Sequence, residues 1–366
     1  MKQFRNMAIG LVLLIGVVII GACTYYNNGI GKVSNDDTIK QIVIDSGTIE
    51  SIGITLKDNN LIKDVNMFKL YIKLTNKSNL KAGIYNLSEN MGVKKIVSLL
   101  EEGSNYNPDE ISITFKEGIN VRKVATLISD NTNNSYDDVM KLMDDNEYIK
   151  SLIDKYWFLT DDILNSNIYY PLEGYLFPNT YRFMNKDVGI KDIFDKMLKE
   201  TDKRLSKYKK EIEKSELSIH ELITLASIVE LEGASAKDRE GVAGVFYNRL
   251  NSSAYPTLGS DATTYYASKI DDWRVSLTYK ELNDCTNKYN TRCNLNKDLP
   301  VGPICNPSIE SIEATINPEE HDYYYFVADC KGEVYLTKNS GEHEKIIKKL
   351  KRENNWCAKS LQKAID

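Results

Sequence analysis

The stretch LASIVELEGAS, residues 225–235, places two glutamates, Glu230 and Glu232, at the end of a run that is otherwise almost wholly apolar. The sequence SIHE lies just upstream, and Ser218 and Glu221 in it have the spacing of a capping box, which marks the first turn of a helix. Gly233 suits the end of that helix, because glycine adopts the backbone conformations that terminate helices. The pattern therefore predicts a mostly buried helix from residue 218 to residue 233.

The two glutamates fall on different sides of this helix. At about 100° per residue, Glu230 lies within the arc of the apolar side chains, whereas Glu232 lies on the opposite side; the arc contains Ile219, Leu222, Ile223, Ala226 and Val229. We therefore expect Glu230 to be carried into the interior, where desolvation and the helix C-terminus favour its protonated form. Such a carboxyl suits a general acid. The alternative is a structural glutamate held by an arginine such as Arg249, and Glu232 is expected to face solvent or to assist.

The composition of the chain excludes several classes of reaction and ligand. The chain has 366 residues, 42% hydrophobic content, a net charge of −5 and only three histidines. No basic face or recognition motif for nucleic acid is present. The sequence HELIT resembles the start of a zinc-binding HExxH motif, but Thr224 occupies the position of the second histidine. No metal and no cofactor are expected, and carboxylate chemistry remains, with glycan cleavage as the leading class.

The N-terminus predicts export. Residues 1–5 carry Lys2 and Arg5, and residues 7–22 form an uncharged apolar run, slightly shorter than the roughly 17–25 residues of a spanning helix. We expect an uncleaved single-pass anchor in the cell membrane, with its N-terminus in the cytoplasm and the rest of the chain outside. The alternative is a lipobox-like site at IGAC, with Cys23 lipidated after signal cleavage.

The cysteines leave the redox state open. Six are present, and three of them, Cys285, Cys293 and Cys305, lie in one segment of the C-terminal region. Their spacings match no metal or redox motif, and pairings cannot be read from sequence. A disulfide within this segment is one hypothesis, and reduced thiols are the other.

Five regions are predicted in an α+β fold. Residues 1–23 form the anchor and 24–39 a polar linker; 40–104 form a small module, 105–217 a connecting α+β region with LEGYLFPNTY, and 218–366 a larger mixed α+β catalytic domain. The module has the strand–helix–helix–strand–helix order and the size of a small carbohydrate-binding domain.

An ordered set of motifs resembles one family. The sequences LASIVELEG, VAGVFYNRL, LGSDATTYY, YNTRCN and LPVGPICNPSIESIEATINPEEHDYYYFVA, together with LEGYLFPNTY, resemble the YceG-like endolytic murein transglycosylases of the MltG type. The resemblance covers nearly the whole chain and includes the anchor and a LysM-like module at 40–104. It implies a lyase that cleaves the MurNAc–GlcNAc β-1,4 bond within peptidoglycan strands and leaves 1,6-anhydro-MurNAc ends, so that it terminates nascent strands.

The resemblance also assigns roles to residues. Glu230 would be the catalytic acid, and then the base that helps the muramyl 6-hydroxyl attack its own anomeric carbon. The residues expected to line the substrate groove are Asp261, Asn248, Arg249, Tyr289, Asn290, Asn306, Glu173 and Tyr175. The chain departs from the family pattern at Gly259, Ala262, Arg292 and Val301, which leaves subsite contacts open.

The expected partners are peptidoglycan glycan strands and the cytoplasmic membrane, with peptidoglycan synthases as candidate protein partners. Two other functions compete. One is a muramidase that uses water, with Asp261 assisting Glu230, since hydrolases of the usual kind need two carboxyls. The other is a non-catalytic peptidoglycan-binding scaffold that acts through the module.

Overall fold

The computed structural model describes most of the chain, namely residues 16–18, 20–104, 109–233, 235–255, 257–292 and 298–356. The predicted anchor lies largely outside these residues. Among the helices of the described part, none combines the length and the apolar character needed to cross a membrane.

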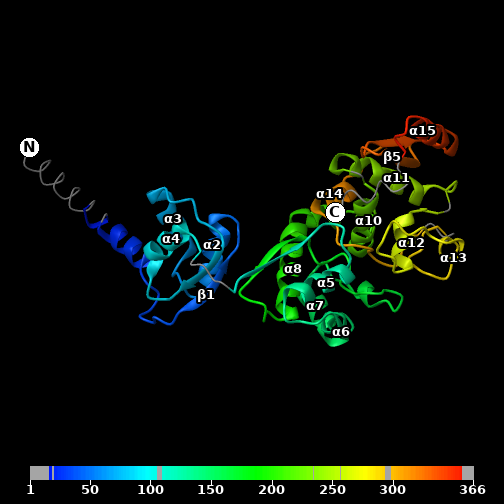
Figure 1. Cartoon of the computed structure of the whole chain (residues 1–366). Coiled ribbons are helices and arrows are strands. Elements are labelled where there is room, and N and C mark those ends of the chain that lie inside the picture. The colour runs from blue at the N-terminus through cyan, green and yellow to red at the C-terminus, as the bar shows by residue number, and fades with distance from the viewer. Residues whose placement is uncertain are drawn as a thin grey trace, which may run out of the picture. The chain divides into compact units, whose positions relative to one another are not determined.

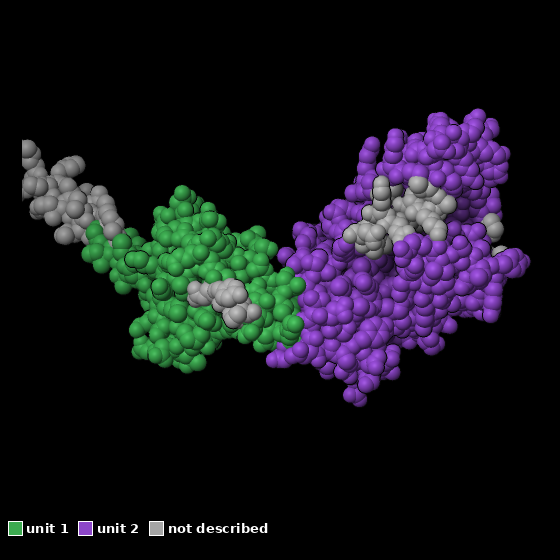
Figure 2. All heavy atoms as spheres, viewed as in Figure 1, with its two compact units in different colours: residues 1–112, 182–186 green, residues 113–181, 187–366 purple. Residues whose placement is uncertain are grey.

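The chain divides into two compact units (Figure 2). Unit 1 comprises residues 1–112 and 182–186, and unit 2 comprises residues 113–181 and 187–366. The region predicted as a connection, 105–217, therefore does not stand apart from the predicted catalytic domain: most of it belongs to the same unit as 218–366.

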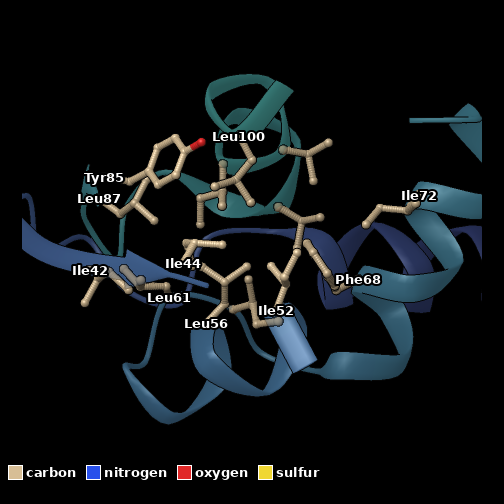
Figure 3. Close-up of a cluster of buried hydrophobic side chains, with 14 of the residues drawn as sticks. Ile42, Ile44, Ile52, Leu56, Leu61, Phe68, Ile72, Tyr85, Leu87 and Leu100 are labelled. Atoms are coloured by element: carbon tan, nitrogen blue, oxygen red, sulfur yellow. The ribbon is translucent and has the colours of Figure 1, made fainter. Parts of the chain in front are cut away.

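Unit 1 has the predicted order of elements: β1 (Lys40–Ile44), α2 (Ile49–Asp58), α3 (Val65–Thr75), β2 (Gly83–Leu87) and α4 (Gly92–Glu102). The two strands pair antiparallel, with Lys40 opposite Leu87 and Ile44 opposite Gly83. Figure 3 shows the core, in which side chains such as Leu56, Phe68 and Leu100 are buried together. This small core belongs to unit 1 itself, which is what an independent module needs.

The rest of the chain is mainly helical, and with unit 1 it makes a mixed α+β fold, as predicted. In chain order the elements are β3 (Ile111–Phe115), α5 (Val121–Asn131), α6 (Tyr136–Met143), α7 (Asn146–Lys155), β4 (Asn179–Phe183), α8 (Ile190–Leu205), α9 (Lys209–Ile212), α10 (Ile219–Glu232), α11 (Arg239–Asn251), α12 (Asp261–Ala267), α13 (Tyr279–Leu282), α14 (Ile309–Ile316), β5 (Tyr325–Ala328), β6 (Val334–Thr337) and α15 (Ser340–Arg352). The strands form two-stranded sheets, β3 with β4 and β5 with β6.

Helix α10 is the centre of unit 2. Its capping box is confirmed: Ser218 Oγ accepts from the Glu221 amide at 3.2 Å, and Glu221 Oε2 accepts from the Ser218 amide at 2.8 Å. Every residue from Leu222 to Leu231 is buried, and α11, α12 and α14 pack around the helix (Figure 1). Between these two residues the helix has no solvent face. The predicted exposed side is found only at the ends of the helix, where Glu221 is exposed and Glu232 is half-buried.

Gly174, in the segment LEGYLF, lies close to α10. Its φ is +87°, in the region that favours glycine. A Cβ atom at this position would lie 2.5 Å from Pro303 Cβ and 2.9 Å from Ile223 Cγ2. Neither neighbour is the free end of a flexible side chain. The close approach of three segments that are distant in sequence therefore depends on this glycine.

We expect Gly174→Ala to lower the free energy of unfolding of unit 2 by about 2 kcal/mol or more, because it adds both strain and a steric clash. Urea unfolding followed by tryptophan fluorescence measures this unit alone, since Trp157, Trp273 and Trp356 all belong to unit 2. Gly341→Ala, in α15 and without a positive φ, is the control and should change stability by less than about 1 kcal/mol. Equal unfolding midpoints for the two variants would contradict the packing argument.

Candidate active site

Glu230 lies in the last turn of α10, and its carboxylate is held by the start of α14. One oxygen, Oε2, accepts three hydrogen bonds: from the Ser308 amide at 2.8 Å, from Ser308 Oγ at 2.5 Å and from Ser311 Oγ at 2.7 Å. Ser308 is the N-cap of α14. The carboxylate therefore sits at the positive end of that helix dipole, where negative charge is stabilised.

Arg239, at the first position of α11, completes these contacts. Its Nη2 donates to Glu230 Oε1 at 2.9 Å, and its Nη1 donates to Ser308 Oγ at 3.0 Å. The side chains of Glu230 and Arg239 are only 6% and 11% exposed, so the pair is shielded from solvent. The arginine that holds Glu230 is thus Arg239, and not Arg249 as the alternative interpretation of the sequence proposed.

All the partners that surround Glu230 are donors: an arginine, a backbone amide and two hydroxyls. Such a set stabilises the carboxylate that remains once the acid has given up its proton. We call Glu230, Arg239, Ser308 and Ser311 the carboxylate clamp.

The loop after β3 forms another side of the site. Gly118, with φ +74°, donates its amide to the Asn306 carbonyl at 2.9 Å, and the Asn306 amide donates to the Ile119 carbonyl at 2.9 Å. A Cβ atom at Gly118 would lie 3.6 Å from Glu230 Cγ. The backbone of this loop is therefore in close contact with the catalytic candidate.

The same loop brings a further carboxyl toward Glu230. Partial burial raises the pKa of Glu117, and the charges of Glu230 and Glu310 raise it further. Sequence reasoning missed both Glu117 and the other three clamp residues, because they lie roughly 110 residues upstream or up to 81 residues downstream of Glu230 and no local pattern connects them.

Asp261, the predicted second carboxyl, has a different partner. It is the first residue of α12 and is exposed, and it forms an ion pair with Arg292. Arg292 is one of the positions at which the chain departs from the family pattern. The arginine that this chain has at position 292 is therefore the ion-pair partner of Asp261.

Two residues that were predicted to line the groove, Glu173 and Tyr175, are buried and hydrogen-bond to other parts of the protein. Both Glu173 oxygens accept from the Val121 amide, at 3.0 and 3.1 Å, and Oε2 also accepts from the Tyr266 hydroxyl at 2.9 Å. The Tyr175 hydroxyl shares a hydrogen bond of 2.9 Å with His220 Nδ1. In this conformation neither side chain faces a groove, because Glu173 is 1% exposed and Tyr175 is 0% exposed.

Three more predicted groove residues are buried in the same way. The Tyr289 hydroxyl accepts from the Tyr169 amide at 3.2 Å. Asn290 Nδ2 donates to the carbonyls of the segment 281–284. Asn306 Oδ1 accepts from the Leu176 amide at 3.0 Å, while its Nδ2 donates to the Ile119 carbonyl at 3.0 Å. These side chains join loops to one another.

Asn248 and Arg249 support the strand β5 region. Asn248 Nδ2 donates to the carbonyls of His321 and Tyr323, at 2.7 and 2.9 Å. Arg249 Nε donates to the Tyr324 carbonyl at 2.7 Å, and its Nη1 donates to the Leu258 carbonyl at 2.8 Å. Both side chains therefore bond backbone carbonyls and join α11 to the segments at 258 and 321–324, a structural role.

Glu232, predicted to face solvent or to assist, is half-buried. Burial raises its pKa to about 7, and the charge of Asp261 contributes in the same direction. Ser260 Oγ, at the N-cap of α12, donates to Glu232 Oε1 at 2.5 Å. The residue is only partly exposed because α12 packs on the side of α10 that the helical arc left open.

A cavity of about 770 Å³ lies near the carboxylate clamp, although none of the four clamp residues lines it. Gly118, Leu231 and Ile304 line its end near Glu230, and α5, α12 and the segment 270–274 form most of its other walls. Its size is that of a ligand site. Within the described residues, no group of three or more His, Cys, Asp or Glu side chains is arranged to hold a metal ion.

The cysteines of the C-terminal segment do not form the hypothesised disulfide. Cys285 and Cys305 are free thiols, the first exposed and the second buried. A disulfide among Cys285, Cys293 and Cys305 would need at least one of these two, so the hypothesis is wrong. Cys330 is disulfide-bonded.

Glu173 predicts a pH dependence of stability. Burial raises its pKa to about 7, well above the ordinary value of 4.5, although the hydrogen bonds from Val121 and Tyr266 oppose the shift. The folded state therefore binds the proton more tightly than the unfolded chain. Its stabilising contribution is complete below about pH 4.5 and is lost as the pH rises through about 7.

Between pH 4.5 and 8 the wild type should lose up to about 3 kcal/mol more stability than Glu173→Gln. Urea unfolding at both pH values, followed by tryptophan fluorescence, measures this difference. Glu147→Gln, at an exposed position in α7, should follow the wild type. Parallel pH profiles for the wild type and Glu173→Gln would contradict this account, because they would show that folding does not raise the pKa of Glu173.

Comparison with known proteins identifies the family. The model of the YceG-like family matches residues 42–349. An endolytic murein transglycosylase of Bacillus subtilis is 35% identical over 91% of this chain and 91% of its own length. One from Streptococcus pneumoniae is 33% identical over 83% of this chain, which spans only 56% of that longer protein.

A solved structure agrees with these matches. The crystal structure of a YceG-like protein from Listeria monocytogenes shares 37% identity with the chain, with a TM-score of 0.59, and covers 85% of this chain and 100% of its own. Family model, curated relatives and solved structure together span both units. The chain belongs to the YceG-like family.

Proposed function

We propose that this protein is an endolytic murein transglycosylase, a lyase that cleaves peptidoglycan glycan strands internally and uses Glu230 as its acid and base. The observation that carries the proposal is the carboxylate clamp, which holds one buried glutamate against Gly118, a residue that lines a ligand-sized cavity. The relatives named as endolytic murein transglycosylases support the same activity. Glycan strands of peptidoglycan are then the substrate.

The clamp distinguishes the two oxygens of Glu230. Oε2 accepts three hydrogen bonds, whereas Oε1 accepts one, from Arg239. Oε1 therefore has lone-pair capacity left for a proton. Ser308 and Ser311 fix Oε2 and thereby the orientation of the whole carboxyl group. Oε1 can then transfer its proton in one defined direction, as general acid–base catalysis requires.

The proposed reaction consumes no water. Oε1 gives its proton to the glycosidic oxygen as the bond from that oxygen to the muramyl anomeric carbon breaks. The muramyl 6-hydroxyl oxygen then bonds to the same carbon, and its proton goes to Oε1. The product carries a 1,6-anhydro ring, and Glu230 is regenerated. As Glu230 becomes anionic in the first step, the clamp donors stabilise the new charge.

One carboxyl is sufficient for this route, because the substrate supplies the nucleophile within its own ring. A muramidase would need a second carboxyl to activate water or to attack the sugar. Asp261, the candidate from the sequence, is paired with Arg292. Glu117, next to Gly118 at the edge of the site, is a better placed candidate for a hydrolytic variant of the reaction.

Membrane attachment is part of the same proposal. The apolar run at residues 7–22 supports a single-pass anchor with a cytoplasmic N-terminus and the rest of the chain outside. The βααβα order of residues 40–102 supports a LysM-like carbohydrate-binding module that would hold the enzyme on its substrate. An enzyme anchored in this way acts near the membrane, where synthases extend new strands, and it would terminate them.

Glu230→Gln should lower turnover of uncrosslinked glycan strands by at least about 100-fold, because Gln keeps the shape of Glu but cannot transfer the proton. Release of cleaved strands, followed by chromatography, measures it. Glu232→Gln is the matched control on the same helix and should have a smaller effect. Comparable losses in the two variants would contradict the assignment of Glu230 as the acid and base.

The exposed thiol of Cys285 provides a test of membrane topology. A membrane-impermeant maleimide should label it in intact protoplasts, and labelling should fall in Cys285→Ser. Labelling of Cys285 only after lysis would place unit 2 in the cytoplasm and contradict the proposed orientation.

A further inference from the structure

The cavity beside the carboxylate clamp has two walls of different chemistry. The first is the start of α5, with Asn120 as N-cap and Arg122 in its first turn. The second is aromatic and comes from α12 and the loop after it, with Tyr265 and Trp273. All of these residues belong to unit 2. No step of the reaction at Glu230 uses them.

The aromatic wall is a fixed surface. The rings of Tyr265 and Trp273 lie 4.7 Å apart at 39°. The Tyr265 hydroxyl donates to the Val275 carbonyl at 2.8 Å, which ties the loop to α12. Both rings are half-buried, so part of each faces the cavity. Ordered aromatic faces of this kind bind the apolar C–H face of a flat ligand with little loss of conformational freedom.

Polar contacts join the two walls and are equally fixed. Asp271, from the loop that also carries Trp273, accepts from Arg122 through both oxygens, at 2.5 and 3.1 Å, and from Asn120 Nδ2 at 2.7 Å. The Arg122 guanidinium lies over the Tyr266 ring, 5.2 Å from its centroid. The Asp271 side chain is nevertheless 55% exposed. A carboxylate has about four acceptor sites, so Asp271 can still accept hydrogen bonds from a ligand.

This combination selects a class of ligand. An aromatic face beside a fixed carboxylate suits a molecule with one apolar face and a rim of hydroxyl and amide donors, which describes an N-acetylated amino sugar. The position of the cavity agrees, because Gly118 and Leu231 line its near end and lie beside Glu230. A sugar in the cavity would thus be adjacent to the bond that Glu230 protonates.

We propose that this cavity is a glycan subsite, which binds an N-acetylated amino sugar next to the scissile bond, with its ring against Trp273 and Tyr265 and its hydroxyls on Asp271. The proposal rests on the proposed function and adds the residues that recognise the strand. A subsite beside the acid holds sugars beyond the cleaved bond, which favours cutting within a strand.

Fluorine NMR of the full chain labelled with 5-fluorotryptophan tests the subsite without any destabilising substitution. The probe is chitotetraose, a tetramer of N-acetylglucosamine without lactyl groups or peptides. Single Trp→Phe variants assign the three tryptophan resonances. All three tryptophans lie in unit 2, so they do not report binding of the probe at unit 1. We expect the Trp273 resonance to shift saturably, while Trp157 and Trp356 stay unchanged.

A kinetic test with glycan strands complements the titration. Trp273→Ala should raise KM about three- to tenfold, the effect of losing one aromatic contact, with a smaller change in kcat. Tyr279→Ala, an 83% exposed aromatic outside the cavity, should leave KM unchanged. Thermal unfolding confirms that each variant is folded.

The outcomes separate the subsite from the proposed function. Strand cleavage that depends on Glu230, together with an unshifted Trp273 resonance, would overturn the subsite and leave the function intact. A Trp273 shift with free stem peptide, but not with chitotetraose, would overturn it in favour of a peptide site. Absence of any glycan cleavage under every condition would remove the proposed function, and the subsite with it.

Discussion

The buried ion pair between Glu230 and Arg239 is the interaction on which the site depends. Two charges removed from water are costly unless further hydrogen bonds satisfy them, and here Ser308 and Ser311 do so from the N-terminus of α14. The arrangement requires α10, α11 and α14 to meet at one point. Their packing is therefore a condition for the chemistry as well as for the fold.

Buried polar side chains bring distant segments to this point. Asn306 bonds the loop at Ile119 and the amide of Leu176, and Glu173 bonds the amide of Val121 at the start of α5. Each such group would destabilise the fold if left without its partners. The polar residues of the motifs thus position the loops around Glu230, rather than contacting substrate themselves in this conformation.

The sequence was sufficient where the signal is local. The capping box at Ser218 and the buried position of Glu230 follow from residues within one helix, and the order of elements in unit 1 follows from short-range patterns. The partial burial of Glu232, the partner Arg239 and the aromatic wall at Trp273 could not be predicted, because they depend on which helices and loops pack together. The separation of two residues along the sequence does not show whether their helices pack together.

The central claim is that Glu230 cleaves the strand by intramolecular transfer, and the products test it most directly. Uncrosslinked glycan strands incubated with the full chain should yield, by mass spectrometry, muramyl ends lighter by one water than hydrolytic ends. These ends should be absent with Glu230→Gln. Reducing muramyl ends in place of anhydro ends would contradict the account and would make a second carboxyl, Glu117 or Asp261, part of a hydrolytic mechanism.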